Sequence, residues 1–241
     1  MSLRINSFLA RSGLGSRRHV ESLVTGGRVT VNGAVCTDLA TQVRPDMDEV
    51  RVNGKQVRPT RERICVMLNK PPGYVVSARD EFGRKTVFDL LPQFPAPVHA
   101  VGRLDRDSEG LLLLTSDGNL SQRLLHPSHK VEKTYKVTCT GRLTRENIET
   151  LRNGVALDDG KTLPARVFIK QRSETKTVLR MVIREGRNRQ IRRMIEAIGS
   201  SVTSLKRLQV GTLKLGRLPA GMWRPLMPRE IEQLLPRKDR L

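Results

Sequence analysis

The sequence predicts an α+β protein of two domains: two short helices on a small sheet, followed by a larger body of strands and helices. Apolar residues recur at helical spacing near the N-terminus, and short strand-like runs joined by Asn-Gly turns follow them. The polar, basic stretch Lys55–Arg63, which contains Pro59, then separates these elements from the rest. We therefore place the first domain at residues 1–58, a linker at 59–63 and the second domain at 64–241.

Two short helices open the first domain. Apolar residues recur at helical spacing from Leu3 to Leu9 and again from Val20 to Val24. Ser16 can cap the second helix, and Gly26-Gly27 ends it. Strands are predicted where short apolar runs flank the turns Asn32-Gly33 and Asn53-Gly54, namely Val29–Val31, Ala34–Cys36, Val50–Val52 and the segment reaching Val57.

A basic surface is predicted on these helices. It comprises Arg4, Arg11, Arg17 and Arg18, and Glu21 is the only acidic residue between Met1 and Val35. Solvated basic surfaces are common on small domains, so this alternative stays open. The charge asymmetry favours contact with RNA phosphates.

In the second domain, strands are indicated by short apolar or alternating runs bounded by turn residues. They are Ile64–Leu68, Tyr74–Val76, Val98–Val101, Leu111–Leu114, Lys133–Cys139, Ala165–Ile169, Val178–Ile183, Val202–Leu208 and Leu213–Leu215. Short helices are indicated by 3.6-residue spacing and by nearby proline, glycine or a capping residue. They are Thr86–Leu91, Leu120–Leu125, Arg145–Leu151, the stretch from Ile191 that Gly199 ends, and Pro228–Leu235.

The charge of the chain indicates a polyanionic partner. Its 44 Lys and Arg residues outnumber its 24 Asp and Glu residues, giving a formal charge of +20. Aromatic residues are too scarce for rows of rings that stack on single-stranded nucleic acid. The scattered Cys36, Cys65 and Cys139 fit buried thiols in a reducing compartment better than disulfides or a zinc site. With no membrane-length apolar stretch and no signal peptide, we expect a cytoplasmic protein without membrane contact.

The stretch Gly102–Gly110 is the first dense motif. It reads Gly-Arg-Leu-Asp-Arg-Asp-Ser-Glu-Gly and runs directly into the apolar Leu111–Leu114, which indicates a loop feeding a buried strand. Asp105 is a candidate reactive carboxylate, because neighbouring guanidinium groups favour its ionised form. The alternative is a turn whose Asp side chains bond their own backbone, and the residues alone leave both readings open.

A second dense motif, Arg184–Met194, leads into a predicted helix. Arg187 and Arg189 lie at the start of that helix, and Arg192 lies one turn further on. A helix N-terminus attracts anions and arginines add bidentate donors, so we expect a phosphate or carboxylate site here. A solvated basic face is the alternative. Lys70, in the stiff turn Asn69–Gly73, is a further candidate phosphate ligand or simply faces water.

Three stretches of the second domain, Leu68–Gly73, Gly102–Leu112 and Glu185–Met194, stand together in order and spacing. In this combination they resemble the RsuA-type family of bacterial ribosomal-RNA pseudouridine synthases. Ser108 stands where that family more often has Thr, and Ser116 where it more often has Asn.

The first domain resembles the small RNA-binding domain of ribosomal protein S4. The matching residues are Arg4–Asn6, Leu9, Gly13, Ser16-Arg17 and Gly27–Gly33, with Asn6 where that domain usually has Asp. The two resemblances together cover nearly the whole chain.

The resemblance implies a fold, a reaction and a set of roles. The second domain would be a mixed, largely antiparallel sheet flanked by helices and loops, with the active cleft across its middle. It would isomerise a uridine of folded ribosomal RNA to pseudouridine without cofactor or metal. Asp105 matches the essential Asp, Tyr135 the tyrosine that packs against the target base, and Arg192 the basic partner of the Asp. Arg103 matches a residue that helps displace the target nucleotide.

One carboxylate suffices for such a reaction, because the departing base is retained and reused, whereas hydrolysis would call for two. The expected partner is ribosomal RNA or a pre-ribosomal particle, and we expect a monomer. Two other functions stay open. The scaffold could serve as a non-catalytic RNA-binding or ribosome-assembly factor, or the chain could be a nucleosidase that releases free uracil.

Overall fold

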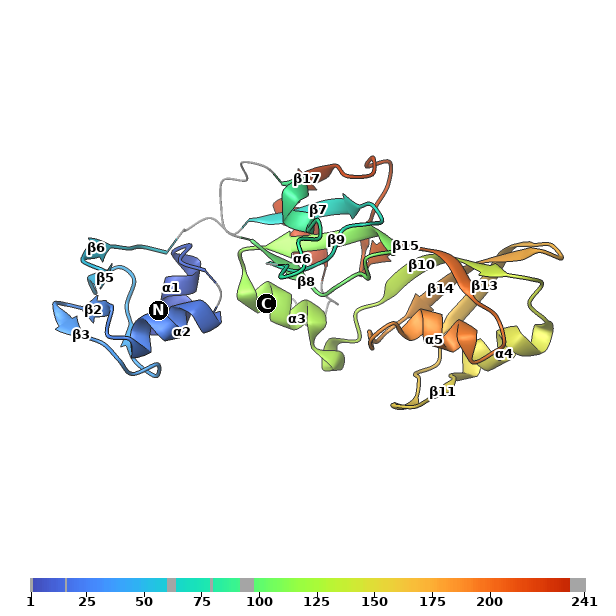
Figure 1. Ribbon diagram of the computed structural model, residues 1–241, viewed down its shortest axis with the longest axis horizontal. Coiled ribbons are helices and arrows are strands. Elements are labelled where there is room, and N and C mark those ends of the chain that lie inside the picture. The colour runs from blue at the N-terminus through green and yellow to red at the C-terminus, as the bar shows by residue number, and fades with distance from the viewer. Residues whose placement is uncertain (1, 16, 60–63, 79, 92–97, 235–241) are drawn as a thin grey trace. The chain divides into compact units, whose positions relative to one another are not determined.

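The computed structural model describes residues 2–15, 17–59, 64–78, 80–91 and 98–234, without the side chains of Arg17 and Arg18. The predicted cap Ser16 lies outside the described residues. The chain divides into two compact units, of which the first holds the described residues up to 59 and the second nearly all of those from 64 onward. Each unit is α+β (Figure 1).

The first unit packs two helices, α1 (Ile5–Arg11) and α2 (Arg17–Thr25), on a small antiparallel sheet. The sheet has the order β3-β2-β5-β6, from β2 (Val29–Val31), β3 (Ala34–Val35), β5 (Val50–Val52) and β6 (Lys55–Gln56). Both predicted Asn-Gly hairpins are present, and Asn32, Gly33, Asn53 and Gly54 all have positive φ, as this turn type requires.

One prediction for this unit needs correction. The first helix begins at Ile5, not Leu3, because Leu3 and Arg4 (β1) pair with β4 (Gln42–Val43). Leu3 and Arg4 thus obtain their backbone hydrogen bonds from a strand about 40 residues away, which their helical spacing does not reveal. The strand predicted after Asn53-Gly54 is present as Lys55 and Gln56, which pair with Val52 and Arg51, so the linker-like stretch begins after them.

The second unit is built on a nine-stranded mixed sheet with the order β13-β14-β10-β15-β9-β7-β17, in which β8 also pairs with β9 and β16 with β15 (Figure 1). The strands are β7 (Cys65–Lys70), β8 (His99–Val101), β9 (Glu109–Thr115), β10 (Lys133–Thr140), β13 (Arg166–Arg172), β14 (Lys176–Ile183), β15 (Val202–Val210), β16 (Leu213–Lys214) and β17 (Trp223–Pro225). All pairs are antiparallel except β15 with β9. A separate hairpin joins β11 (Ala156–Leu157) to β12 (Gly160–Lys161).

Helices cover parts of this sheet (Figure 1). They are α3 (Gly118–Leu125), α4 (Arg145–Asn153), α5 (Gln190–Glu196) and α6 (Pro228–Gln233), with 3₁₀ turns η1 (Val87–Leu90) and η2 (Pro127–His129). Asp117 caps α3, and Thr144 with Asn147 forms a capping box on α4. No helix within the described residues is long and apolar enough to cross a membrane.

The strand predicted at Tyr74–Val76 is absent; only Val75 forms a single bridge, to Thr86. The chain turns away after β7 at Pro71, Pro72 and Gly73, where Gly73 has a φ of 93°. The two edges of β7 are already paired, one with β9 and the other with β17. No place beside β7 is therefore left for a returning strand.

The parallel contact between β9 and β15 positions the loop that carries Asp105. Glu109 lies opposite Lys206, and Gly110 lies opposite Arg207. A Cβ atom on Gly110 would lie 2.3 Å from the carbonyl oxygen of Arg207, so only glycine permits this approach. The predicted buried strand Leu111–Leu114 is confirmed as the centre of β9, where all four leucines are buried.

Candidate active site

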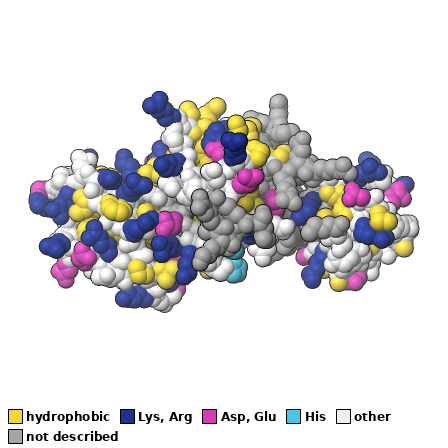
Figure 2. Space-filling view, turned by 180° about the vertical axis from the view of Figure 1, so that it is seen from behind, with side chains coloured by type: hydrophobic (Ala, Val, Ile, Leu, Met, Phe, Trp, Pro, Cys, Tyr) yellow, Lys and Arg dark blue, Asp and Glu magenta, His cyan; other side chains and the backbone are white. Residues whose placement is uncertain are grey.

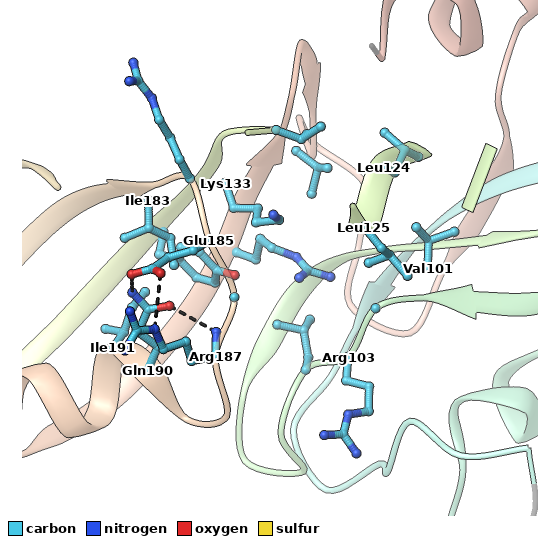
Figure 3. A pocket seen from close by; sticks show the side chains of 18 of the residues that line it. Val101, Arg103, Leu124, Leu125, Lys133, Ile183, Glu185, Arg187, Gln190 and Ile191 are labelled. Atoms are coloured by element: carbon cyan, nitrogen blue, oxygen red, sulfur yellow. Dashed lines mark hydrogen bonds and ion pairs between the residues drawn. The ribbon is translucent and has the colours of Figure 1, made fainter. Parts of the chain in front are cut away.

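A cavity of about 400 Å³ lies in the second unit, between the loop before β9 and the loop before α5. Its volume is within the range of sites that hold small organic groups. Figure 3 shows apolar side chains on opposite sides of it, with Val101, Leu124 and Leu125 on one side and Ile183 and Ile191 on the other. Polar side chains such as Asp105 and Gln190 also line the cavity, so it is suited to a ring with apolar faces and a polar edge, such as a nucleobase.

Asp105 lies in the lining of this cavity with 31% of its side chain exposed. One carboxylate oxygen, Oδ2, is 3.8 Å from Arg189 Nη1 and also 3.8 Å from Arg192 Nε. Two guanidinium groups therefore flank this carboxylate. The loop thus holds the carboxylate of Asp105 at the edge of the cavity, where a bound ligand could approach it.

Arg192, on α5, is buried behind this carboxylate with 8% of its side chain exposed. Its shortest ion pair is to Asp107, with Nη2 at 2.9 Å from Oδ2. It also donates to Ser108 Oγ at 3.4 Å and to the carbonyl oxygen of Val202 at 3.3 Å. Its Nε is buried and has no hydrogen-bond acceptor among the described residues. The guanidinium of Arg192 thus lies near two carboxylates, those of Asp105 and Asp107. The ion pair with Asp107 was not predicted from the loop motif.

Tyr135 is buried on β10 and lines the cavity. Arg207, opposite it on β15, lines the cavity as well and donates from Nε to the carbonyl oxygen of Leu111 at 2.6 Å. Lys133 completes the group, and its pKa is lowered by burial and by the charge of Arg207. Our sequence reasoning missed Arg207 and Lys133. The two-residue alternation of β10, which puts Lys133 on the same face as Tyr135, was a signal for the lysine.

The predicted RNA-binding arginines of this region fall into two groups. Arg103 and Arg189 line the cavity and are exposed, Arg189 with 47% of its side chain. The guanidinium of Arg187 instead donates to the carbonyl oxygens of Gly160 and Lys161, both at 2.7 Å, and to the carboxylate of Glu185 at 3.2 Å. Arg187 also lines the cavity, but most of its donors already have acceptors within the protein, so the phosphate contact predicted for Arg187 stays a prediction.

Lys70 needs correction as an RNA ligand. Its side chain is fully buried, and its ammonium donates to the carbonyl oxygens of Pro71, Arg106 and Ser108 at 3.0, 3.2 and 2.7 Å. Two of these acceptors belong to the loop that carries Asp105. Lys70 thus fastens that loop to the end of β7 and is out of reach of a phosphate.

Replacement of Lys70 by Met should lower the free energy of unfolding at pH 7 by about 3 kcal/mol, because three carbonyl oxygens lose a charged donor, and the contact with Ser108 among them is fully buried. Burial lowers the pKa of Lys70 to about 8 in the folded protein, from its ordinary 10.5. Between pH 8 and 10.5 the unfolded wild-type chain binds more protons at Lys70 than the folded protein does. The contribution of Lys70 to the free energy of unfolding should therefore increase as pH rises from 8 to 10.5, and this increase is lost as pH falls back to 8. Urea unfolding of both proteins from pH 7 to 10.5 measures this. A difference that does not change with pH would contradict the assignment.

On the first unit, Arg4 is exposed and Arg11 is half-buried, whereas the side chains of Arg17 and Arg18 lie outside the described residues. The basic surface there stays a prediction.

The three cysteines are buried, and burial raises the pKa of the Cys65 and Cys139 thiols to about 12. Thiols of this kind are unreactive. Among the described residues, no group of three His, Cys, Asp or Glu side chains is placed to hold a metal ion.

Comparison with known proteins gives matches over almost all of the chain. The family model described as RNA pseudouridylate synthase matches residues 64–197, and the S4 domain model matches residues 3–50. A protein of Aquifex aeolicus named as an uncharacterized RNA pseudouridine synthase is 41% identical over 97% of this chain and 94% of its own. The ribosomal large subunit pseudouridine synthase B of Bacillus subtilis is 40% identical over 96% of this chain and 95% of its own.

A solved structure gives the same result. The crystal structure of a pseudouridylate synthase superposes with a TM-score of 0.69 and 32% identity, and the match covers 96% of this chain and 99% of the other. The resemblance found in the sequence motifs is thus supported by family models, by full-length relatives and by the mixed, mostly antiparallel sheet. The chain belongs to the RNA pseudouridylate synthase family and carries an N-terminal S4 domain.

Proposed function

We propose that this protein isomerises a uridine of ribosomal RNA to pseudouridine, with Asp105 as the group that acts on the nucleotide. The observation that carries the proposal is the position of Asp105 at an apolar cavity, 3.8 Å from both Arg189 and Arg192. Ribosomal RNA as the substrate is supported by the name of the Bacillus subtilis relative and by the S4 domain.

The reaction breaks the bond between ribose C1′ and uracil N1 and forms a bond between C1′ and uracil C5. The proton on C5 leaves, N1 gains a proton, and no atom is lost overall. Positive charge develops on the ribose as the first bond breaks, and an ionised carboxylate beside it stabilises that charge or adds to the sugar. Asp105 supplies this carboxylate, and Arg192 fixes its position from the buried side.

The target nucleotide has to leave its base stack before Asp105 can reach the sugar, which costs a few kcal/mol. Tyr135 would pack against the everted base inside the cavity. Arg103, exposed at the cavity, would contact the RNA at the vacated place, and Arg189 would contact a neighbouring phosphate. Phosphate contacts of this kind offset the cost of unstacking.

The S4 domain would add affinity through Arg4, Arg11, Arg17 and Arg18. We propose ribosomal RNA or a pre-ribosomal particle in the cytoplasm as the partner of a monomeric enzyme. A non-catalytic assembly factor would bind the same RNA but would have no need of a carboxylate held between two arginines at an apolar cavity.

Mapping pseudouridines in ribosomal RNA from cells with and without this gene tests the proposal. We expect one or a few sites to lose the modification completely and to regain it when the wild-type gene is returned. An identical pseudouridine map in both strains would reject the enzymatic assignment. Chromatography of the purified enzyme with RNA should show no free uracil, since release of uracil would identify a nucleosidase.

A further inference from the structure

A row of cations crosses the sheet on the face opposite the proposed active site. The register places Phe168 of β13 beside Arg180 of β14, Arg180 beside Lys136 of β10, and Lys136 beside Lys206 of β15. We call Phe168, Arg180, Lys136 and Lys206 the cross-strand row. Neighbouring strands lie about 4.8 Å apart, so the three cations span roughly 10 Å in one line.

The row and the cavity occupy opposite faces because side chains alternate along a strand. Tyr135 and Arg207 line the cavity, whereas Lys136 and Lys206, each one residue away, point to the other side. Figure 1 shows α4 and α5 on one side of these strands. Phe168, Arg180 and Lys136 are exposed, Phe168 at 48%, so the described residues leave the row uncovered.

The arrangement is unfavourable for the protein by itself. Like charges directly opposite each other on neighbouring strands destabilise a sheet, and here two such pairs are consecutive. Lys206 has an ion pair with Glu109 at 3.4 Å, whereas no acidic partner is found for Lys136 or Arg180 among the described residues. Glu109 therefore balances the charge of Lys206, whereas the repulsion between Lys136 and Arg180 is not relieved within the described part of the protein.

Two ordinary explanations do not account for the row. Cations protect edge strands from pairing with other chains, which explains Lys170 and Arg172 on the edge strand β13. Arg180, Lys136 and Lys206 lie on inner strands, where no edge needs protection. Long side chains also cover apolar neighbours such as Val178, but a neutral side chain of similar length would do this without the repulsion.

We propose that the cross-strand row is a second RNA-binding surface, on which three consecutive cations contact the backbone of a single-stranded RNA segment and Phe168 stacks on one unpaired base. Aromatic side chains on open sheet faces bind unpaired bases in this way, with cations along the backbone. Figure 2, seen from behind, shows many Lys and Arg side chains over the part of the second unit that carries β13 and β14. The inference rests on the proposed function only for the partner being RNA.

The test compares two double variants in fluorescence-anisotropy titrations with an oligouridylate of about twelve nucleotides. Lys136→Gln/Arg180→Gln should weaken binding at least about tenfold and reduce the salt slope by about 1.4, the value for two lost contacts to a single strand. Arg145→Gln/Lys214→Gln removes the same charge from exposed residues of α4 and β16 and should change affinity less than about twofold. Equal weakening by both variants, or none by the first, would overturn the proposal.

Phe168→Ala measures the stacking contact separately. It should weaken oligouridylate binding about fivefold or more, and an oligonucleotide with 4-thiouridine should crosslink to β13 under ultraviolet light in the wild type. Crosslinks found only at the cavity would overturn the proposal. Pseudouridine formation at saturating RNA should keep its rate in all these variants. If the variants of the cross-strand row bind RNA like the wild type and isomerisation is intact, this second surface alone is rejected. If the wild-type enzyme does not isomerise uridine, the proposed function is rejected.

Discussion

Replacement of Asp105 by Asn should abolish pseudouridine formation and leave RNA binding within about twofold of the wild type. Asn keeps the size of the side chain but has no charge to stabilise the ribose and no oxygen able to add to it. We expect the rate at saturating RNA to fall by at least about 10³-fold, the size of effect found when a group acting on the reacting atoms is removed. Release of tritium from RNA labelled at uridine C5 measures the rate.

Asp107→Asn is the matched control for this change. Asp107 lies two residues away in the same loop and has the shorter ion pair with Arg192, but its side chain is mostly exposed and is not part of the cavity lining. The control removes one carboxylate from the loop and leaves Asp105 in place, so it should retain most of the activity. An Asp105→Asn enzyme with unaltered activity, or an Asp107→Asn enzyme that is equally inactive, would reject the special role of Asp105.

Gly110→Ala should have the second largest effect, on the fold itself. The added Cβ would lie 2.3 Å from the carbonyl oxygen and 2.8 Å from the nitrogen of Arg207, and Gly110 has a φ of 104°. The clash is with backbone, so no side-chain rotation relieves it, and the conformation is strained for any L-residue. We expect the free energy of unfolding to fall by about 4 kcal/mol or more, enough to prevent stable folding of a marginal protein.

Gly118→Ala gives the comparison within the same chain. A Cβ at Gly118, in the first turn of α3, would meet no atom within 4 Å, and its φ is not in the left-handed region. Alanine here should stabilise the protein by roughly 0.4–1 kcal/mol, because it restricts the unfolded chain. Urea unfolding of both variants decides the matter. A small loss in Gly110→Ala would mean that β9 and β15 approach each other less closely than described.

Much of this molecule follows from local sequence. Hydrophobic periodicity predicts most strands of the large sheet, and the two Asn-Gly pairs predict both hairpins of the first unit, because spacing and turn chemistry act over a few residues. The motif around Asp105 predicts a loop at the start of a buried strand, and β9 confirms it. The large positive charge similarly indicates a class of partner without any knowledge of the fold.

The partners of the cations are decided only by the tertiary structure. In the sequence, Lys70 and Arg187 are candidate phosphate ligands. In the structure, each donates hydrogen bonds to carbonyl oxygens of segments that are distant in the chain. Arg207 enters the proposed site because β15 pairs with β9, which brings it to Leu111, 96 residues away in the chain. A short motif can therefore identify a candidate charged side chain but not its hydrogen-bond partners. The order of strands in the sheet determines which acceptors it meets, because hydrogen bonds and ion pairs form only at close distance.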